Sequence, residues 1–217
     1  MKFKIVSLFV LCAILISCGT SRQGGKKQRK GTKAQVVLTP EQQRKYDYFF
    51  LEASRLKMKD DYSAAFDLLQ HCLTINPNAS SALYEISQYY MYLKQVPQGQ
   101  AALEKAVEND PDNYWYSQGL ASLYQQQNEM QKATNLLESM ATRFSDRMDP
   151  LYSLLDIYNR LEEYDNVITT LNRLEEKMGK NEQLSMEKFR IYLQKKDNQS
   201  AFREIESLVE DRKSTRL

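Results

Sequence analysis

Hydrophobic residues recur along the chain with a period of 34 positions, beginning at Tyr46. When the sequence from Tyr46 onward is written in lines of 34, the lines align without a gap. Position 11 of successive lines is Leu56, Tyr90, Tyr124, Tyr158 and Tyr192, and position 24 is Leu69, Leu103, Leu137, Leu171 and Ile205. A fixed period of this length is typical of tandem structural repeats. The sequence therefore predicts repeats at 46–79, 80–113, 114–147, 148–181 and 182–215, the last with the weakest pattern.

Each repeat is expected to form two α-helices, because two apolar stripes with helical spacing follow one another in it. In the second repeat these stripes are Leu83, Ile86 and Tyr90, then Leu103, Ala106 and Val107. A small residue at position 20, such as Gly99 or Ala133, would let the two helices approach closely. The tyrosines at position 11 are expected to fill the space towards the following pair. One pair cannot bury both stripes, so the sequence predicts an all-α fold in which the pairs stack as a solenoid.

Capping residues and prolines agree with these helices. Thr39 can cap a helix that begins at Pro40, and Gln42 completes a capping box. The remaining prolines stand at expected helix starts or just after expected helix ends: Pro97 and Pro150, then Pro77 and Pro111.

The period and its fixed positions resemble the tetratricopeptide repeat (TPR) family. Pairs such as Leu120-Ala121 stand where that family has Leu-Gly or Leu-Ala, and Pro77 and Pro111 stand at its helix-terminating proline. The fifth repeat departs from the family pattern at Lys188, Phe189 and Asn198. The resemblance implies a right-handed superhelix whose concave face, lined by the first helices, binds a peptide or a partner protein.

The register of the resemblance assigns candidate residues to that concave groove: Tyr84, Gln88, Tyr92, Trp115, Gln118, Ser122, Tyr152 and Asp156. Aromatic rings supply contact area and amides can meet backbone groups, so this mixture suits an extended peptide. Alternatively, some of these aromatic side chains pack between helices. The carboxylate clamp of chaperone-binding relatives needs Lys and Asn where Phe50 and Ser54 stand, so a chaperone partner is not supported.

The N-terminal segment has the pattern of a lipoprotein signal peptide. A basic start is followed by an uncharged run from Ile5 to Ile16, which is about 18 Å long as a helix and too short for a bilayer core of about 30 Å. Leu15-Ile16-Ser17-Cys18 resembles the bacterial lipobox. We therefore expect a signal peptide at 1–17 and lipid anchoring through Cys18 in the cell envelope. Gly19 differs from the Asp that retains lipoproteins at the inner membrane, which favours the outer membrane with either face possible.

Charge divides the chain in two. Residues 1–40 contain eight Lys or Arg and no acid, although the whole chain has 30 Lys or Arg and 28 Asp or Glu. Residues 41–217 therefore hold 22 bases and 28 acids, a balance of −6. Four glycines and six basic residues between Gly19 and Leu38 predict a basic, Gly-rich tether over 18–38. It lacks aromatic stacking residues, so nucleic acid is not an expected partner.

The remaining chemistry is sparse. One His and three Cys cannot form a His/Cys metal site or a disulfide framework, and we expect no metal, no cofactor and no enzymatic activity. Cys72 is expected to be a buried structural thiol, and His71 a partly exposed helix residue rather than a catalytic base. The repeat domain is predicted over 39–211, followed by a disordered or artificial tail at 212–217, where the apolar period ends.

These observations favour a membrane-anchored, non-catalytic scaffold that binds a protein or peptide. One alternative is a glycan-binding envelope lipoprotein, because Trp115 could stack on a sugar ring. Another is that the repeats belong to a longer protein with a C-terminal functional domain.

Overall fold

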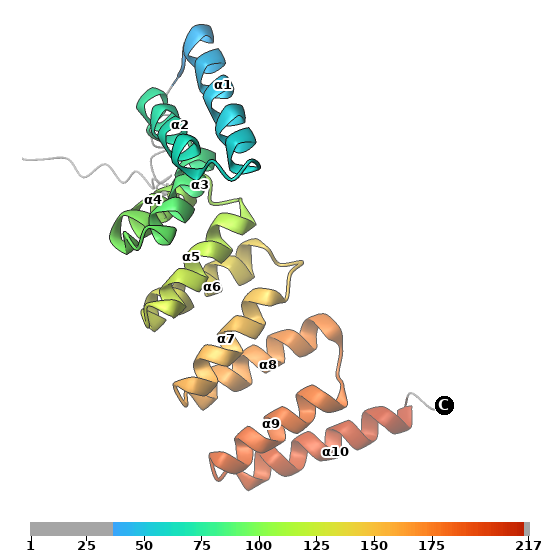
Figure 1. Ribbon diagram of the computed structural model, residues 1–217. Helices are drawn as coiled ribbons and strands as arrows, with labels where there is room; N and C mark the ends of the chain where they lie inside the picture. Colours follow the sequence, from blue (N-terminus) through green and yellow to red (C-terminus); the bar gives the residue numbers. More distant parts are fainter. Residues whose placement is uncertain (1–36, 215–217) are drawn as a thin grey trace, which may run out of the picture. The chain divides into compact units, whose positions relative to one another are not determined.

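The computed structural model describes residues 37–214, and side chains as far as residue 210. This part of the chain holds ten α-helices and no strand, which confirms the predicted all-α fold class (Figure 1). The helices are α1 (Pro40–Lys57), α2 (Tyr62–Ile75), α3 (Ser80–Tyr92), α4 (Val96–Asn109), α5 (Tyr114–Gln126), α6 (Met130–Arg143), α7 (Asp149–Arg160), α8 (Tyr164–Met178), α9 (Glu182–Gln194) and α10 (Asn198–Ser214).

Each helix packs principally on its neighbours in the chain, so the five helix pairs follow one another in sequence order (Figure 1). The odd-numbered helices are the first helices of the repeats, and the even-numbered helices are the second. Helix α10 continues to Ser214, three residues beyond the predicted end of the domain at Asp211. The predicted signal peptide, Cys18 and the tether as far as residue 36 lie outside the described residues, as do residues 215–217.

The turn inside every pair has the same backbone conformation. Position 15 of each repeat has a positive φ of 57° to 61°, although none of these residues is a glycine: Asp60, Lys94, Asn128, Glu162 and Lys196. The backbone N–H of position 16 donates to the carbonyl oxygen of position 11. For example, the N–H of Gln95 donates to the carbonyl oxygen of Tyr90 at 2.8 Å. This left-handed residue with a six-to-one hydrogen bond is the Schellman motif that ends helices. The same turn therefore recurs every 34 residues, which is also the period of the apolar positions in the sequence.

The predicted capping box is present at the start of α1. The backbone N–H of Gln42 donates to Oγ1 of Thr39 at 3.2 Å, and the N–H of Thr39 donates to Oε1 of Gln42 at 2.9 Å. Pro40, Pro97 and Pro150 lie in the first turns of α1, α4 and α7, as predicted.

Close approach of the helices explains the small residues at position 20. Ala65, Ala133 and Val167 are fully buried, and Gly99 is buried between α3 and α4. A Cβ atom on Gly99 would lie 2.8 Å from Sδ of Met91 and 3.2 Å from the carbonyl oxygen of Ser87. Position 24 is also buried in the first four repeats. Leu69 belongs to a core cluster of α1 to α3, whereas Leu103, Leu137 and Leu171 belong to a second cluster that extends from α4 to α9.

The tyrosines at position 11 of the second, third and fourth repeats face the preceding helix pair, which corrects the expectation that they fill the space towards the following one. Tyr124 Oη donates to Oε1 of Glu104 in α4 at 2.9 Å, and Tyr158 Oη donates to Oε1 of Glu138 in α6 at 3.3 Å. In the second repeat, the ring of Tyr90 makes an edge contact with Phe66 of α2 at 5.4 Å between centroids. Each contact therefore joins a first helix to the second helix before it.

The unusual fifth repeat contains a buried ion cluster. Lys188 is only 3 % exposed at a position where the second, third and fourth repeats have Ile or Leu. Its Nζ lies 2.7 Å from Glu175 of α8 and 3.1 Å from Glu204 of α10. Burial alone would lower the pKa of Lys188, but the bonds to these carboxylates outweigh it and the pKa is raised. The departure from the family pattern is thus compensated by acids on the two adjacent helices.

Candidate partner-binding surface

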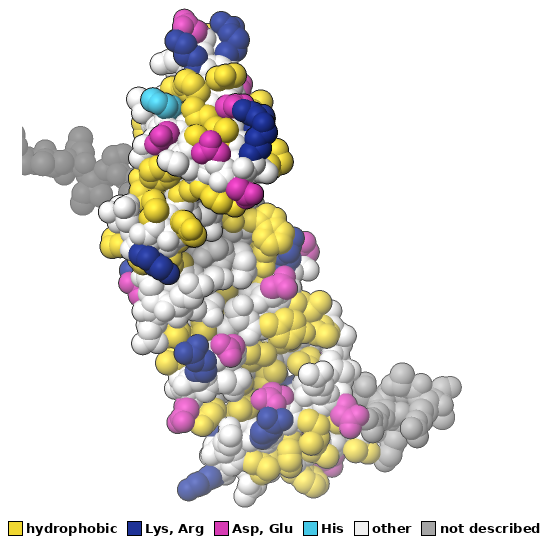
Figure 2. Space-filling view, in the orientation of Figure 1, with side chains coloured by type: hydrophobic (Ala, Val, Ile, Leu, Met, Phe, Trp, Pro, Cys, Tyr) yellow, Lys and Arg dark blue, Asp and Glu magenta, His cyan; other side chains and the backbone are white. Residues whose placement is uncertain are grey.

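Three successive first helices expose a large aromatic side chain. Tyr92 at the end of α3 is 79 % exposed, Trp115 at the start of α5 is 63 % exposed, and Tyr152 in α7 is 47 % exposed. Hydrophobic side chains recur from pair to pair on the face that Figure 2 shows. Exposed aromatic residues of this size are common at sites that bind other proteins.

Tyr84 of α3 lies between helices instead. Its ring is half-buried and stacks at a tilt on Tyr116 of α5, with centroids 4.9 Å apart. Tyr84 therefore joins neighbouring first helices, and only part of its ring can meet a partner.

The predicted polar residues of the groove differ in their availability. Gln118 accepts a hydrogen bond of 3.0 Å from Tyr114 Oη, and Ser122 is half-buried. Gln88 is exposed, and its Nε2 donates to Oγ of Ser87 at 3.2 Å. Asp156 is exposed and lies 4.0 Å from Arg160, a distance at which a surface ion pair contributes little. Gln88 and Asp156 are thus the predicted polar groups with most freedom to meet a partner.

A cavity of about 430 Å³ opens between α1, α2 and α3. We call it the tyrosine pocket, and it is lined by Lys57, Tyr62, Gln88, Tyr89 and Tyr92. A second cavity of about 480 Å³ shares Lys57 and Tyr62 with it and extends to Ser54, Met58 and Glu85. The volume of the tyrosine pocket is within the range of small-ligand sites, and three rings supply an apolar lining.

Tyr89 has an unused hydroxyl group in this pocket. Only 8 % of Tyr89 is exposed, and its Oη has no hydrogen-bond partner among the described residues. Burial raises the pKa of this phenol, so it stays protonated and can donate. A buried hydroxyl without a partner costs stability in the free protein. An acceptor atom on a bound partner would remove that cost.

The neighbouring charges are already engaged. Lys57 Nζ bonds to Oε2 of Glu85 at 2.7 Å, and this bond raises the pKa of Lys57. Tyr62 Oη donates to Oδ1 of Asp60 at 2.7 Å. The pocket therefore presents apolar rings, the amide of Gln88 and the phenol of Tyr89 rather than a free ion.

Trp115 is held in place without being covered. Oδ1 of Asn113 accepts from the N–H of Trp115 at 3.1 Å and so caps α5. The rings of Trp115 and Tyr114 meet edge to face at 5.3 Å, and the Arg147 guanidinium lies 4.0 Å from the Tyr114 centroid and 5.6 Å from that of Trp115. These contacts fix the ring while leaving most of its surface to solvent.

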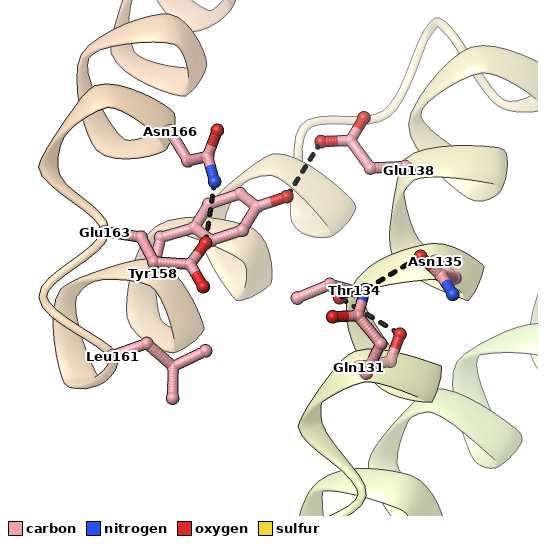
Figure 3. Close-up of a pocket in the computed structure, with 8 residues that line it drawn as sticks. All are labelled: Gln131, Thr134, Asn135, Glu138, Tyr158, Leu161, Glu163 and Asn166. Carbon is pink, nitrogen blue, oxygen red and sulfur yellow. Dashed lines mark hydrogen bonds between the residues drawn. The ribbon is translucent and has the colours of Figure 1, made fainter.

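A smaller cavity of about 220 Å³ between α6, α7 and α8 has a polar lining (Figure 3). Inside it Tyr158 bonds to Glu138, and Nδ2 of Asn166 donates to Oε2 of Glu163 at 2.6 Å. Figure 3 shows Tyr158 pointing across the cavity towards Glu138, whereas Asn166 and Glu163 lie together on one side of it. Because its polar groups satisfy each other, this cavity serves the packing of repeats rather than a ligand.

The tyrosine pocket contains residues that sequence reasoning missed. Tyr89 stands at position 10, where Leu123, Ile157 and Ile191 form core in later repeats, and Tyr62 begins a second helix. The one available signal in the sequence was the phenol hydroxyl of Tyr89 at a position that is otherwise Leu or Ile in the later repeats. Tyr92 and Gln88 were predicted, and the structure brings them together with Tyr89 around one cavity.

Within residues 37–214, no group of three or more His, Cys, Asp or Glu side chains is arranged to hold a metal ion. None of the described helices is both long enough and apolar enough to cross a membrane. Cys72 is fully buried, and burial raises the pKa of its thiol to about 11. His71 is exposed and lies 5.5 Å from the ring of Phe49.

The fold defined by these pairs is a tetratricopeptide-repeat solenoid. The family model described as tetratricopeptide repeat matches residues 80–113, the second repeat of the chain. Together with the solved structures below, this match supports the TPR family for the chain. No curated protein matches the sequence.

Several solved structures have the same fold. A crystal structure of MamA is 18 % identical with a TM-score of 0.57, over 77 % of this chain and 92 % of MamA. A tetratricopeptide repeat protein from Parabacteroides merdae is 15 % identical with a TM-score of 0.57, over 77 % of this chain and 67 % of that protein. YrrB, described as a TPR protein with an unusual peptide-binding site, is 12 % identical with a TM-score of 0.54, over 75 % of this chain and 84 % of YrrB.

Proposed function

We propose that the chain is a lipid-anchored, non-catalytic scaffold of a bacterial envelope that binds a peptide or protein partner along its first helices. The observation that carries the proposal is the tyrosine pocket, in which the buried hydroxyl of Tyr89 has no partner and Tyr92 and Gln88 remain exposed. Repeats of this family are generally interaction modules without catalytic activity.

An extended peptide fits the chemistry of this surface. A large apolar side chain of the partner would enter the tyrosine pocket, and a backbone carbonyl beside it would accept from Tyr89 Oη. Trp115 and Tyr152 supply further contact area on the next two first helices. Rigid rings give such area at a small cost in conformational entropy. The peptide-binding site named for YrrB adds a precedent within the same fold.

The anchor is proposed from sequence. Leu15-Ile16-Ser17-Cys18 supplies the lipid attachment, and the basic tether at 18–38 would separate the repeats from the membrane surface. Gly19 favours the outer membrane. Fractionation of cells tests this part: Cys18→Ser should move the protein out of the membrane fraction, and continued retention there would remove the lipid anchor.

Crosslinking of the full chain in native envelopes, followed by mass spectrometry, tests the binding surface. Wild-type protein is compared with the combined variant Tyr92→Ala, Trp115→Ala and Tyr152→Ala. The control is Tyr48→Ala, because Tyr48 is an exposed aromatic of α1 outside the proposed groove. We expect one partner protein to be captured by wild type and control and lost from the combined variant. Capture of oligosaccharide alone, or capture unaffected by the three substitutions in a folded protein, would overturn the proposal.

A further inference from the structure

A second cavity adjoins the tyrosine pocket. Its volume is about 480 Å³, and we call it the ion-pair pocket because it contains the bonded side chains of Lys57 and Glu85. Ser54, Met58 and Tyr62 complete its lining. Lys57 and Tyr62 line both cavities, so the two lie side by side. A peptide whose side chain fills the tyrosine pocket therefore has these polar groups next to it.

The ion pair in this pocket is exposed enough to exchange its cation. Nζ of Lys57 lies 2.7 Å from Oε2 of Glu85, and 48 % of the lysine side chain and 28 % of the glutamate side chain are exposed. Lys57 is the last residue of α1, and its ammonium group ends a flexible four-carbon chain. An ion pair at such a surface contributes little to stability. Lys57 can therefore leave Glu85 for solvent at a small cost.

Glu85 is an unusual residue for its place in the repeat. It is the one charged residue of α3, and α5 has no charged residue at all. It stands at position 6, where the first, third and fourth repeats have Leu51, Gly119 and Ser153. Packing of a repeat therefore does not require a carboxylate at this position, and Glu85 is available for a contact outside the stack.

The charge around the ion-pair pocket favours a cation. Asp60, in the turn between α1 and α2, accepts a hydrogen bond of 2.7 Å from Tyr62 Oη and places a second carboxylate beside that ring. Residues 40–92 contain seven Asp or Glu and five Lys or Arg, a balance of −2. Tyr62 is 48 % exposed, and the face of an aromatic ring attracts cations. A basic side chain of a partner would thus complement the pocket.

We propose that the ion-pair pocket binds an arginine side chain of the partner peptide, which replaces Lys57 as the cation on Glu85. The planar guanidinium donates N–H groups to the carboxylate and packs on the exposed part of the Tyr62 ring. Lys57 moves into solvent. The inference rests on the peptide-binding function proposed above, and it adds a basic residue to the large apolar residue of the peptide.

The geometry of an extended peptide sets the spacing of these two residues. Neighbouring side chains of an extended chain point to opposite sides, whereas side chains two positions apart project to the same side, about 7 Å from each other. The tyrosine pocket and the ion-pair pocket adjoin through Lys57 and Tyr62. We therefore expect the arginine two positions before or after the apolar residue.

A library of random short peptides displayed on phage tests this specificity. Peptides are selected on the immobilised full chain, and enriched sequences are synthesised with a fluorescent label so that anisotropy measures their binding. We expect a large apolar residue with an arginine two positions away. Enrichment of no peptide would overturn the proposed function together with this inference. Enrichment of apolar residues without a basic residue at that spacing would overturn this inference alone.

Lys57→Met is the most informative variant, because it leaves Glu85 without its internal cation. The enriched arginine peptide should bind this variant at least about threefold more tightly than wild type, and Glu85→Gln about tenfold more weakly. Lys45→Met and Glu41→Gln are the controls, since they alter another exposed ion pair of α1 and should leave affinity unchanged. Weaker binding to Lys57→Met, or equal binding to Glu85→Gln and wild type, would overturn the inference.

Discussion

The hydroxyl of Tyr124 in α5 donates a hydrogen bond of 2.9 Å to a carboxylate oxygen of Glu104 in α4, and the same relationship recurs between Tyr158 and Glu138. Each bond crosses from a first helix to the second helix of the preceding pair. Burial, followed by the bond to Glu104, raises the pKa of Tyr124 far above its usual range. These tyrosines therefore link repeats through both their rings and their hydroxyl groups.

Replacing Tyr124 with Phe should lower the free energy of unfolding by about 1.5 kcal/mol, because a hydrogen bond to a partly buried charged group is lost. Gln100 still donates to Glu104 at 2.8 Å, which limits the loss. Urea unfolding followed by circular dichroism measures the change. Tyr92→Phe is the control, since Tyr92 is exposed and should leave stability unaltered. Equal stability of both variants would contradict a stabilising role for the bond.

Alkaline pH should destabilise the stack. The pKa values of Tyr46, Tyr114, Tyr124 and Tyr158 are raised by burial above the ordinary value of 10.0. A raised folded-state pKa contributes stability that is fully present below the unfolded-state pKa and is lost as pH rises through the folded-state value. The melting temperature should therefore be constant near pH 8 and fall above about pH 10. The fall should be shallower in Tyr124→Phe, and an identical slope would contradict this account.

Glycine at position 15 should stabilise the repeats. Glu162 has a φ of 57°, a conformation in which its Cβ atom is strained. Glu162→Gly should therefore raise the free energy of unfolding by about 1 kcal/mol. Thr169→Gly, at an exposed interior position of α8, should lower it by about the same amount. A decrease in both variants would show that the left-handed turn carries no strain.

Removing the charge of Lys188 should be costly. Lys188→Leu leaves Glu175 and Glu204 close together without their cation and should lower the free energy of unfolding by about 3 kcal/mol. The triple variant with Glu175→Val and Glu204→Leu restores residue types found at these positions in earlier repeats. Its stability should equal or exceed that of wild type. Thermal unfolding distinguishes these outcomes, and a stable single variant would mean that the cluster is dispensable.

Tyr89→Phe separates binding from stability. Its hydroxyl has no partner among the described residues, so its removal should leave stability unchanged or raise it by up to about 1 kcal/mol. Partner capture should nevertheless weaken, because the bound peptide loses a donor. Chemical unfolding and envelope crosslinking measure the two effects. A loss of stability like that expected for Tyr124→Phe would mean that the hydroxyl is already bonded in the free protein.

The sequence was sufficient for the fold because its apolar period directly encodes which residues face a neighbour. The small residues at position 20, the capping box at Thr39 and the prolines fixed the helix boundaries from local chemistry alone. The direction of Tyr124 was predicted wrongly. Periodicity places a side chain between pairs, but the choice between the two neighbours depends on the tilt of packed helices.

The candidate site was less accessible to sequence reasoning. Lys57, Tyr62 and Tyr89 come from three helices, and only their packing creates the cavity they share. From the sequence, Lys188 could be interpreted only as a departure from the family pattern. Its compensating acids, Glu175 and Glu204, lie 13 and 16 residues away on different helices. Buried polar groups depend on such distant partners, whereas an apolar stripe is visible in one helix.

The stacking of pairs principally on their nearest neighbours also bears on how such a chain can evolve. A duplication or deletion of one 34-residue unit re-creates the same junction on both sides, including the left-handed turn and the tyrosine contact to the previous pair. Length can therefore change in whole repeats without redesign of the interior. Shorter insertions within a helix would shift every later apolar residue off its stripe. Selection on this architecture thus favours whole-unit changes in length over small ones.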